Sequence, residues 1–318
     1  MERKHLPRPG LLRLWVAAGL FLFLSGGWAN SAQNDRSGAT GVRGDQYIAR
    51  FVNGVFTFIS PQGKVEGFDL RPAFFFLTSQ FSNEGTNVAG YADSTFTILN
   101  RRLDTLWIRR TMLRNVTDLA VSPGGTRVAY LNRPRPGSEA RELGYLSETS
   151  SATTLATVNL NADDRGASIS WDATGGRIVF ESDDDIAIIG IDGRAQERIG
   201  RGCAPSWSPD GLKIAYRDND GNGVMYDVGS GSSRRLSLTR SRCAAFHWSP
   251  DSRLIFTREI SDTSSGDCFD DERFVIYRIE DGFRQGRYTP CGLRDNTFGW
   301  LRDHNEWRKA VVDRAARR

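Results

Sequence analysis

The chain has 318 residues, of which 39% are hydrophobic and 25% charged. This composition is that of a globular protein and excludes wholesale disorder. The formal net charge is +4, but residues 1–29 hold four basic residues and one acidic residue. Without them the net charge falls to about +1, so there is no global basic field of the kind that binds nucleic acid.

Residues 1–29 have the three parts of a secretory signal peptide. Four basic residues precede an uninterrupted apolar run over residues 14–24, and Gly27-Trp28-Ala29 places small residues at a cleavage position. The apolar run is short for a bilayer, so we predict cleavage near Ala29 and a secreted or periplasmic protein that does not span the membrane. The alternative is that the leader is retained as a membrane anchor.

Two short segments precede the main body of the chain. Residues 30–45 are polar and rich in glycine and serine, so we expect a flexible lead-in. Residues 47–51 and 55–59 then alternate in hydrophobicity around Asn53-Gly54, which is a β-hairpin turn signal.

From residue 81 onward the chain repeats one short motif. The best copy is SWSPDGLKIAY, which begins at Ser206, and the next is WSPDSRLIF, which begins at Trp248. In each copy an anchor residue ends one strand, a tight turn follows, which is Ser-Pro-Asp-Gly in the best copy, and an apolar strand completes a hairpin. The residues that carry the repeat are Trp171, Trp207, Pro209, Asp210, Gly211, Trp248, Pro250, Asp251 and Trp300.

The spacing of the anchors predicts the fold. They fall at residues 81, 121, 171, 207, 248 and 300. A period of about 40 residues is typical of a β-propeller with four strands per blade. We therefore predict an all-β, six-bladed β-propeller over residues 46–318. The copy at Trp300 ends too early for four strands, so we expect residues 47–64 to complete its blade and close the ring. Residues 305–318 could be strand, helix or tail.

The W-S-P-D-G-x-x-I-A-Y motif resembles the WD40-like repeat of the TolB family and of the propellers in prolyl-oligopeptidase-type peptidases. The resemblance covers roughly residues 46–312 and implies a fold rather than a function, since this repeat serves many roles. TolB carries an α/β domain ahead of its propeller, for which this chain has no room. The role of TolB is therefore not carried over.

The expected blade order assigns the loops to two faces. The Ser-Pro-Asp-Gly turns share one face, here called the turn face. Two long insertions, residues 132–142 and 259–272, fall on the opposite face, here called the loop face. Long loops on a rigid scaffold are a usual place for binding, so we predict that a protein or an envelope component binds there. The alternative is that they are insertions without a partner.

All four cysteines also map to the loop face: Cys203, Cys243, Cys268 and Cys291. An even number in an exported chain suggests two disulfides. Pairs of Cys203 with Cys243 and of Cys268 with Cys291 would join neighbouring blades. Four free buried thiols are the alternative.

One turn matches the opening of a calcium loop, with Asp218, Asp220 and Asn222 as candidate ligands. The position of the expected bidentate glutamate is Gly229, so a polar hairpin turn is the competing interpretation. No other cofactor is expected.

Catalytic residues are scarce. Only His247 and His304 remain beyond the leader, and the known hydrolase, metallopeptidase and nucleotide-binding motifs are absent from the sequence. We therefore predict a non-catalytic module that binds a protein. The alternatives are a metal-dependent hydrolase or a small-ligand binder acting at the central channel.

Overall fold

The computed structural model describes residues 47–60, 64–160, 168–194, 197–241, 244–259, 273–288 and 298–317. The chain separates into two compact units, residues 1–40 and 41–318. The first unit, with the predicted leader and its cleavage position, lies outside the described residues, and all of the described strands and the helix belong to the second unit.

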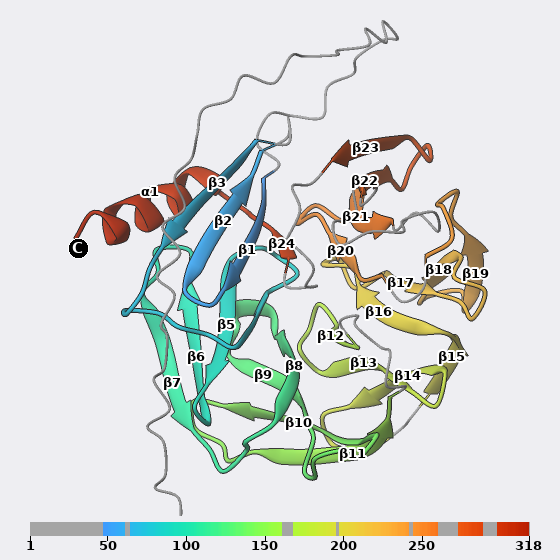
Figure 1. Ribbon diagram of the computed structural model, residues 1–318. Coiled ribbons are helices and arrows are strands. Elements are labelled where there is room, and N and C mark those ends of the chain that lie inside the picture. The colour runs from blue at the N-terminus through green and yellow to red at the C-terminus, as the bar shows by residue number, and fades with distance from the viewer. Residues whose placement is uncertain are drawn as a thin grey trace, which may run out of the picture. The chain divides into compact units, whose positions relative to one another are not determined.

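Six four-stranded antiparallel sheets are arranged in a ring, which confirms the predicted six-bladed β-propeller (Figure 1). Blade 1 consists of β24 (Phe298–Trp300), β1 (Ile48–Val52), β2 (Val55–Ile59) and β3 (Val65–Asp69). Blade 2 consists of β4 (Thr78–Phe81), β5 (Asn87–Ala92), β6 (Thr95–Asn100) and β7 (Thr105–Arg110), and blade 3 of β8 (Val116–Val121), β9 (Arg127–Asn132), β10 (Ala140–Ser147) and β11 (Thr153–Asn159). Each blade is given from its innermost strand outward.

The other three blades have the same order. Blade 4 consists of β12 (Ile169–Trp171), β13 (Arg177–Ser182), β14 (Asp185–Gly190) and β15 (Glu197–Arg201), and blade 5 of β16 (Cys203–Trp207), β17 (Lys213–Arg217), β18 (Gly223–Asp227) and β19 (Ser232–Arg235). Blade 6 consists of β20 (Phe246–Trp248), β21 (Leu254–Glu259), β22 (Arg273–Arg278) and β23 (Arg284–Tyr288). The α-helix α1 (His304–Ala315) follows β24, the innermost strand of blade 1.

Blade 1 closes the ring as predicted. β24 pairs with β1, so that Trp300 lies opposite Ile48. The Asn53-Gly54 turn joins β1 to β2 with positive φ at both positions, which a tight hairpin turn requires. The blade also takes in β3, whose residues lie beyond the expected range 47–64. The innermost strands of all six blades contact their neighbours around the ring.

The tryptophan that ends an innermost strand is buried against the neighbouring blade. The exposed fractions are 1% for Trp171, 0% for Trp207, 2% for Trp248 and 2% for Trp300. Three of the four indoles donate a hydrogen bond to the carbonyl of the residue before the preceding blade's anchor: Trp171 to Ala120 (2.9 Å), Trp248 to Ser206 (3.0 Å) and Trp300 to His247 (2.8 Å). The anchor therefore links blades by a polar contact as well as by packing.

The turn after the anchor is held by its own side chains. In blade 5, the Ser208 hydroxyl accepts a hydrogen bond from the backbone N–H of Lys213 at 2.9 Å. Asp210 accepts one from the backbone N–H of Leu212 at 3.0 Å and one from the Ser208 hydroxyl at 2.6 Å. These contacts satisfy backbone donors that the tight turn leaves unpaired, which is why serine and aspartate recur there.

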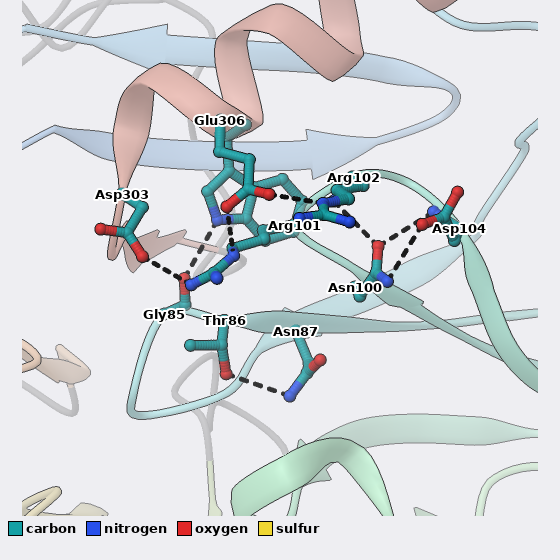
Figure 2. Close-up of polar contacts among 10 residues, drawn as sticks. Gly85, Thr86, Asn87, Asn100, Arg101, Arg102, Asp104, Asp303 and Glu306 are labelled. Atoms are coloured by element: carbon teal, nitrogen blue, oxygen red, sulfur yellow. Dashed lines mark hydrogen bonds and ion pairs between the residues drawn. The ribbon is translucent and has the colours of Figure 1, made fainter.

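The segment left undecided by the sequence is α1, which packs against β3 and the turn of blade 2. Trp307 is fully buried, and its indole donates to the carbonyl of Gly85 at 3.0 Å. Glu306 forms ion pairs with Arg101 and Arg102, as Figure 2 shows. The helix therefore covers the outer edge of blade 1, where an uncovered strand would expose free backbone groups. Within the described residues, no helix is both long and apolar enough to cross a membrane.

Replacement of Trp207 by alanine should lower the free energy of unfolding by about 3–5 kcal/mol, because the side chain is fully buried between blades. Urea unfolding would measure the loss. As a control, Leu212→Ala alters a side chain that is 57% exposed in the same turn and should change stability by less than about 0.5 kcal/mol. A near-neutral Trp207 variant would contradict the anchor role.

A second pair of variants tests the contact between blade 1 and blade 2. Gly85 has a φ of +67°, and a Cβ there would collide with the backbone of Trp300 and Arg302. Gly124 has a φ of +73° in the corresponding turn of blade 3, with open space around it. Gly124→Ala should therefore cost about 1–2 kcal/mol from backbone strain, whereas Gly85→Ala should cost about 3–5 kcal/mol. Equal losses of stability in urea unfolding would show that the contact between blade 1 and blade 2 tolerates the added methyl group.

Candidate functional site

The centre of the ring is nearly filled at the turn face. The innermost strands enclose a cavity of about 30 Å³, which is room for a water molecule. A small-molecule site needs about 300 Å³ or more. At this level the channel therefore gives no support to the small-ligand alternative.

Asn83, in the turn of blade 2, reaches across the centre of the ring. Its side-chain amide donates to the carbonyl of Trp207 at 2.9 Å and also contacts the carbonyl of Trp171 at 3.3 Å. These contacts join blade 2 to blades 4 and 5. Asn83 occupies the turn position that Pro209 holds in blade 5, and this departure from the repeat is the signal that could have identified it.

His247 lines the central cavity and is 8% exposed. Its ring packs against those of Phe256 and Phe298, with centroids 5.5 Å and 6.3 Å away. Burial lowers its pKa to about 4, so the imidazole is neutral near pH 7. Across the described ranges, no three His, Cys, Asp or Glu side chains come together as a metal site would require. The hydrolase alternative thus gains no site from this part of the chain.

Two carboxylates tie adjacent blades together toward the loop face. Asp118 accepts hydrogen bonds from the backbone N–H groups of Ser168 at 2.6 Å and Leu119 at 2.8 Å. Burial raises its pKa to about 7. Glu181 accepts from the backbone N–H of Ala204 at 3.1 Å. Both carboxylates hold the first residues of the next innermost strand, which is a structural role.

The candidate calcium loop connects β17 to β18. Asp218 accepts hydrogen bonds from the backbone N–H groups of Asp220 at 3.0 Å and Asn222 at 2.8 Å. The Asn222 amide lies 3.0 Å and 2.9 Å from its two carboxylate oxygens. The carboxylate therefore holds the hairpin turn, as the competing interpretation expects. Calcium binding by Asp218, Asp220 and Asn222 stays a prediction.

Cys203 is the first residue of β16 and is disulfide-bonded. Its partner is not among the described residues, because Cys243, Cys268 and Cys291 all lie outside them. The two proposed pairings therefore stay predictions.

The first long insertion connects β9 to β10 and is fixed to the segment before β8. The backbone N–H of Arg133 donates to the carbonyl of Asn115 at 2.9 Å, and the Asn115 amide donates back to the carbonyl of Arg133 at 3.2 Å. The insertion and the connection between blades 2 and 3 thus form one continuous surface. In the second insertion, 259–272, only Glu259 belongs to the described residues.

Three large apolar side chains are exposed on the loop face. The exposed fractions are 46% for Phe75, 59% for Leu77 and 87% for Met112. Leu77 donates through its backbone N–H to the carbonyl of Tyr91 at 2.9 Å, and the Tyr91 hydroxyl donates to the carbonyl of Leu113 at 2.7 Å. These bonds place the segment before β4 close to the segment before β8. The apolar run over residues 73–77 was the available sequence signal for this patch.

No protein-family model matches the chain, and no curated protein matches its sequence. Solved structures are similar in fold. TolB from Acinetobacter baumannii has a TM-score of 0.56 at 13% identity and is aligned over 81% of this chain and 66% of that one, just under two thirds of its length. Putative TolB from Agrobacterium tumefaciens has a TM-score of 0.54 at 16% identity, over 81% and 97%. The chain has the fold of a TolB-like six-bladed β-propeller. At 13% and 16% identity, the similarity concerns the fold alone.

The neutral, buried His247 should make stability depend on pH. Its pKa is about 4 when folded and near 6.5 when unfolded, so the unfolded chain binds the extra proton between these values. The stability that neutral His247 contributes is present above pH 6.5 and lost as the pH falls toward 4. The wild type should therefore exceed His247→Gln in free energy of unfolding at pH 7, and this difference should become smaller at pH 4.5 in urea unfolding. Asp118 has the opposite pH dependence but is present in both proteins, so its effect cancels. Parallel pH curves would contradict this role.

Proposed function

We propose that the chain is an exported, non-catalytic propeller that binds a protein in the periplasm, the cell envelope or the extracellular space. The binding surface is the loop face with the insertions at 132–142 and 259–272. The observation that carries this proposal is the exposure of Phe75, Leu77 and Met112, which belong to the segments before β4 and β8 on that face. Apolar side chains exposed together on a rigid scaffold are typical of a protein interface.

The centre of the propeller supports the same proposal. The cavity of about 30 Å³ leaves little room for a substrate, and Asn83 crosses it. His247, which lines the cavity, is buried among aromatic rings and neutral. These observations favour a partner bound on the outer surface over a substrate bound at the centre of the ring.

A pull-down from the native envelope or secretome tests this proposal, with Leu77→Ser as the variant and Leu212→Ser as the control. The two leucines are 59% and 57% exposed but lie on opposite faces. We expect a specific protein that is retained by the wild type and the control and lost from the Leu77 variant. Equal retention by both variants, or no retained protein, would contradict binding at the loop face.

The same pull-down, repeated with a chelator, tests the calcium prediction. Loss of the partner on chelation, restored by added calcium but not in Asp218→Asn, would support Asp218, Asp220 and Asn222 as ligands. Retention that does not change with chelator would leave Asp218 with its turn-holding role alone.

A further inference from the structure

Four arginines line the surface formed by the first insertion and the connection before β8: Arg114, Arg133, Arg135 and Arg141. None of them forms an ion pair with a described residue, whereas some exposed arginines elsewhere do. Arg198 pairs with Asp185 at 2.7 Å, and Arg278 pairs with Asp281 at 2.9 Å. The positive charge on this part of the loop face is therefore left without a counter-charge from the described chain.

Arg141 is the least exposed of the four, at 5%. One end of its guanidinium donates to the carbonyls of Ser138 and Ala140 within the insertion, but its Nε has no acceptor. The Nε of Arg133 is likewise buried without an acceptor. An unpaired donor on a buried cation costs free energy, so the described chain leaves both guanidinium groups incompletely satisfied.

The two guanidinium groups also repel each other. Burial and the neighbouring charge of Arg133 lower the pKa of Arg141. Two carboxylates belong to the same insertion, yet neither comes within ion-pair distance of these arginines. Glu142 accepts a hydrogen bond from Asn132 at 3.1 Å, and Glu139 is exposed. The charge of Glu139 acts in the opposite direction on the pKa of Arg141, but the two like charges are held together without an ion pair to a described carboxylate.

We propose that this arginine surface binds a carboxylate-bearing segment of the partner protein, an inference that rests on the proposed function. Guanidinium groups bind carboxylates through paired hydrogen bonds, and the exposed side chains of Arg114 and Arg135 form no hydrogen bond or ion pair with a described residue. Met112, which is 87% exposed, lies two residues from Arg114. A protein segment with acidic and apolar residues satisfies both features, whereas a free anion would leave Met112 uncovered.

The test uses the exposed residues Arg114 and Arg135, because neither side chain supports the fold through a bond to a described residue. A fluorescein-labelled peptide of glutamates with interspersed leucines is titrated with the purified protein, and anisotropy is measured. We expect saturable binding that weakens with salt and becomes about tenfold weaker in Arg114→Gln/Arg135→Gln. The control is Arg194→Gln/Arg253→Gln, which removes two exposed, unpaired arginines from the turn face and should leave affinity unchanged.

Three results would overturn the inference: equal binding of a peptide with glutamine in place of glutamate, equal affinity in the Arg114/Arg135 variant, or binding to anionic vesicles but not to the peptide. The protein captured in the pull-down separates this inference from the proposed function. If that protein binds the Arg114/Arg135 variant as tightly as the wild type, the loop face is a binding surface. The inference that its arginines bind an acidic segment of the partner is then refuted.

Discussion

The fold depends on the hydrogen bond that an anchor tryptophan donates across the gap between two blades. The innermost strands are short and belong to separate sheets, so packing alone would leave backbone carbonyls at their ends unpaired. The indole of Trp171 satisfies the carbonyl of Ala120 while its ring fills the space between blades. One residue therefore provides both apolar burial and polar satisfaction, which explains why tryptophan recurs at this position.

Two blades lack a tryptophan anchor, blade 2 and blade 3, and blade 2 differs in an informative way. Blade 2 ends its innermost strand with Phe81, which has no polar group to donate. Its turn uses Asn83 to reach the carbonyls of two other anchors, and its Gly85 carbonyl accepts from the Trp307 indole. Polar contacts that blades 1, 4 and 6 obtain from a tryptophan anchor are thus supplied here by residues from the turn and the C-terminal helix.

The sequence was informative wherever local chemistry decides structure. The Ser-Pro-Asp-Gly turns, the Asn53-Gly54 hairpin and the anchor spacing predict six blades, because each depends on residues close in sequence. The closing pair joins distant residues and was predicted only because the copy at Trp300 ends too early for four strands. The helix at 304–315 was undecided, since Trp307 is fixed by contacts with Phe56 and Phe81 from distant strands. The exposure of Leu77 and the orphaned donor of Arg141 were also inaccessible, because both arise only from the packing of separate segments.

The pairing of β24 with β1 has a consequence for the order of folding. Trp300 and Ile48 are partners across about 250 residues, so the contact closes a very long loop and forms late. Until then β1, β2 and β3 are an incomplete sheet with an unpaired edge, which other chains or proteases can reach. A chain interrupted before residue 298 therefore lacks the strand that completes its first blade, even though five blades are already encoded.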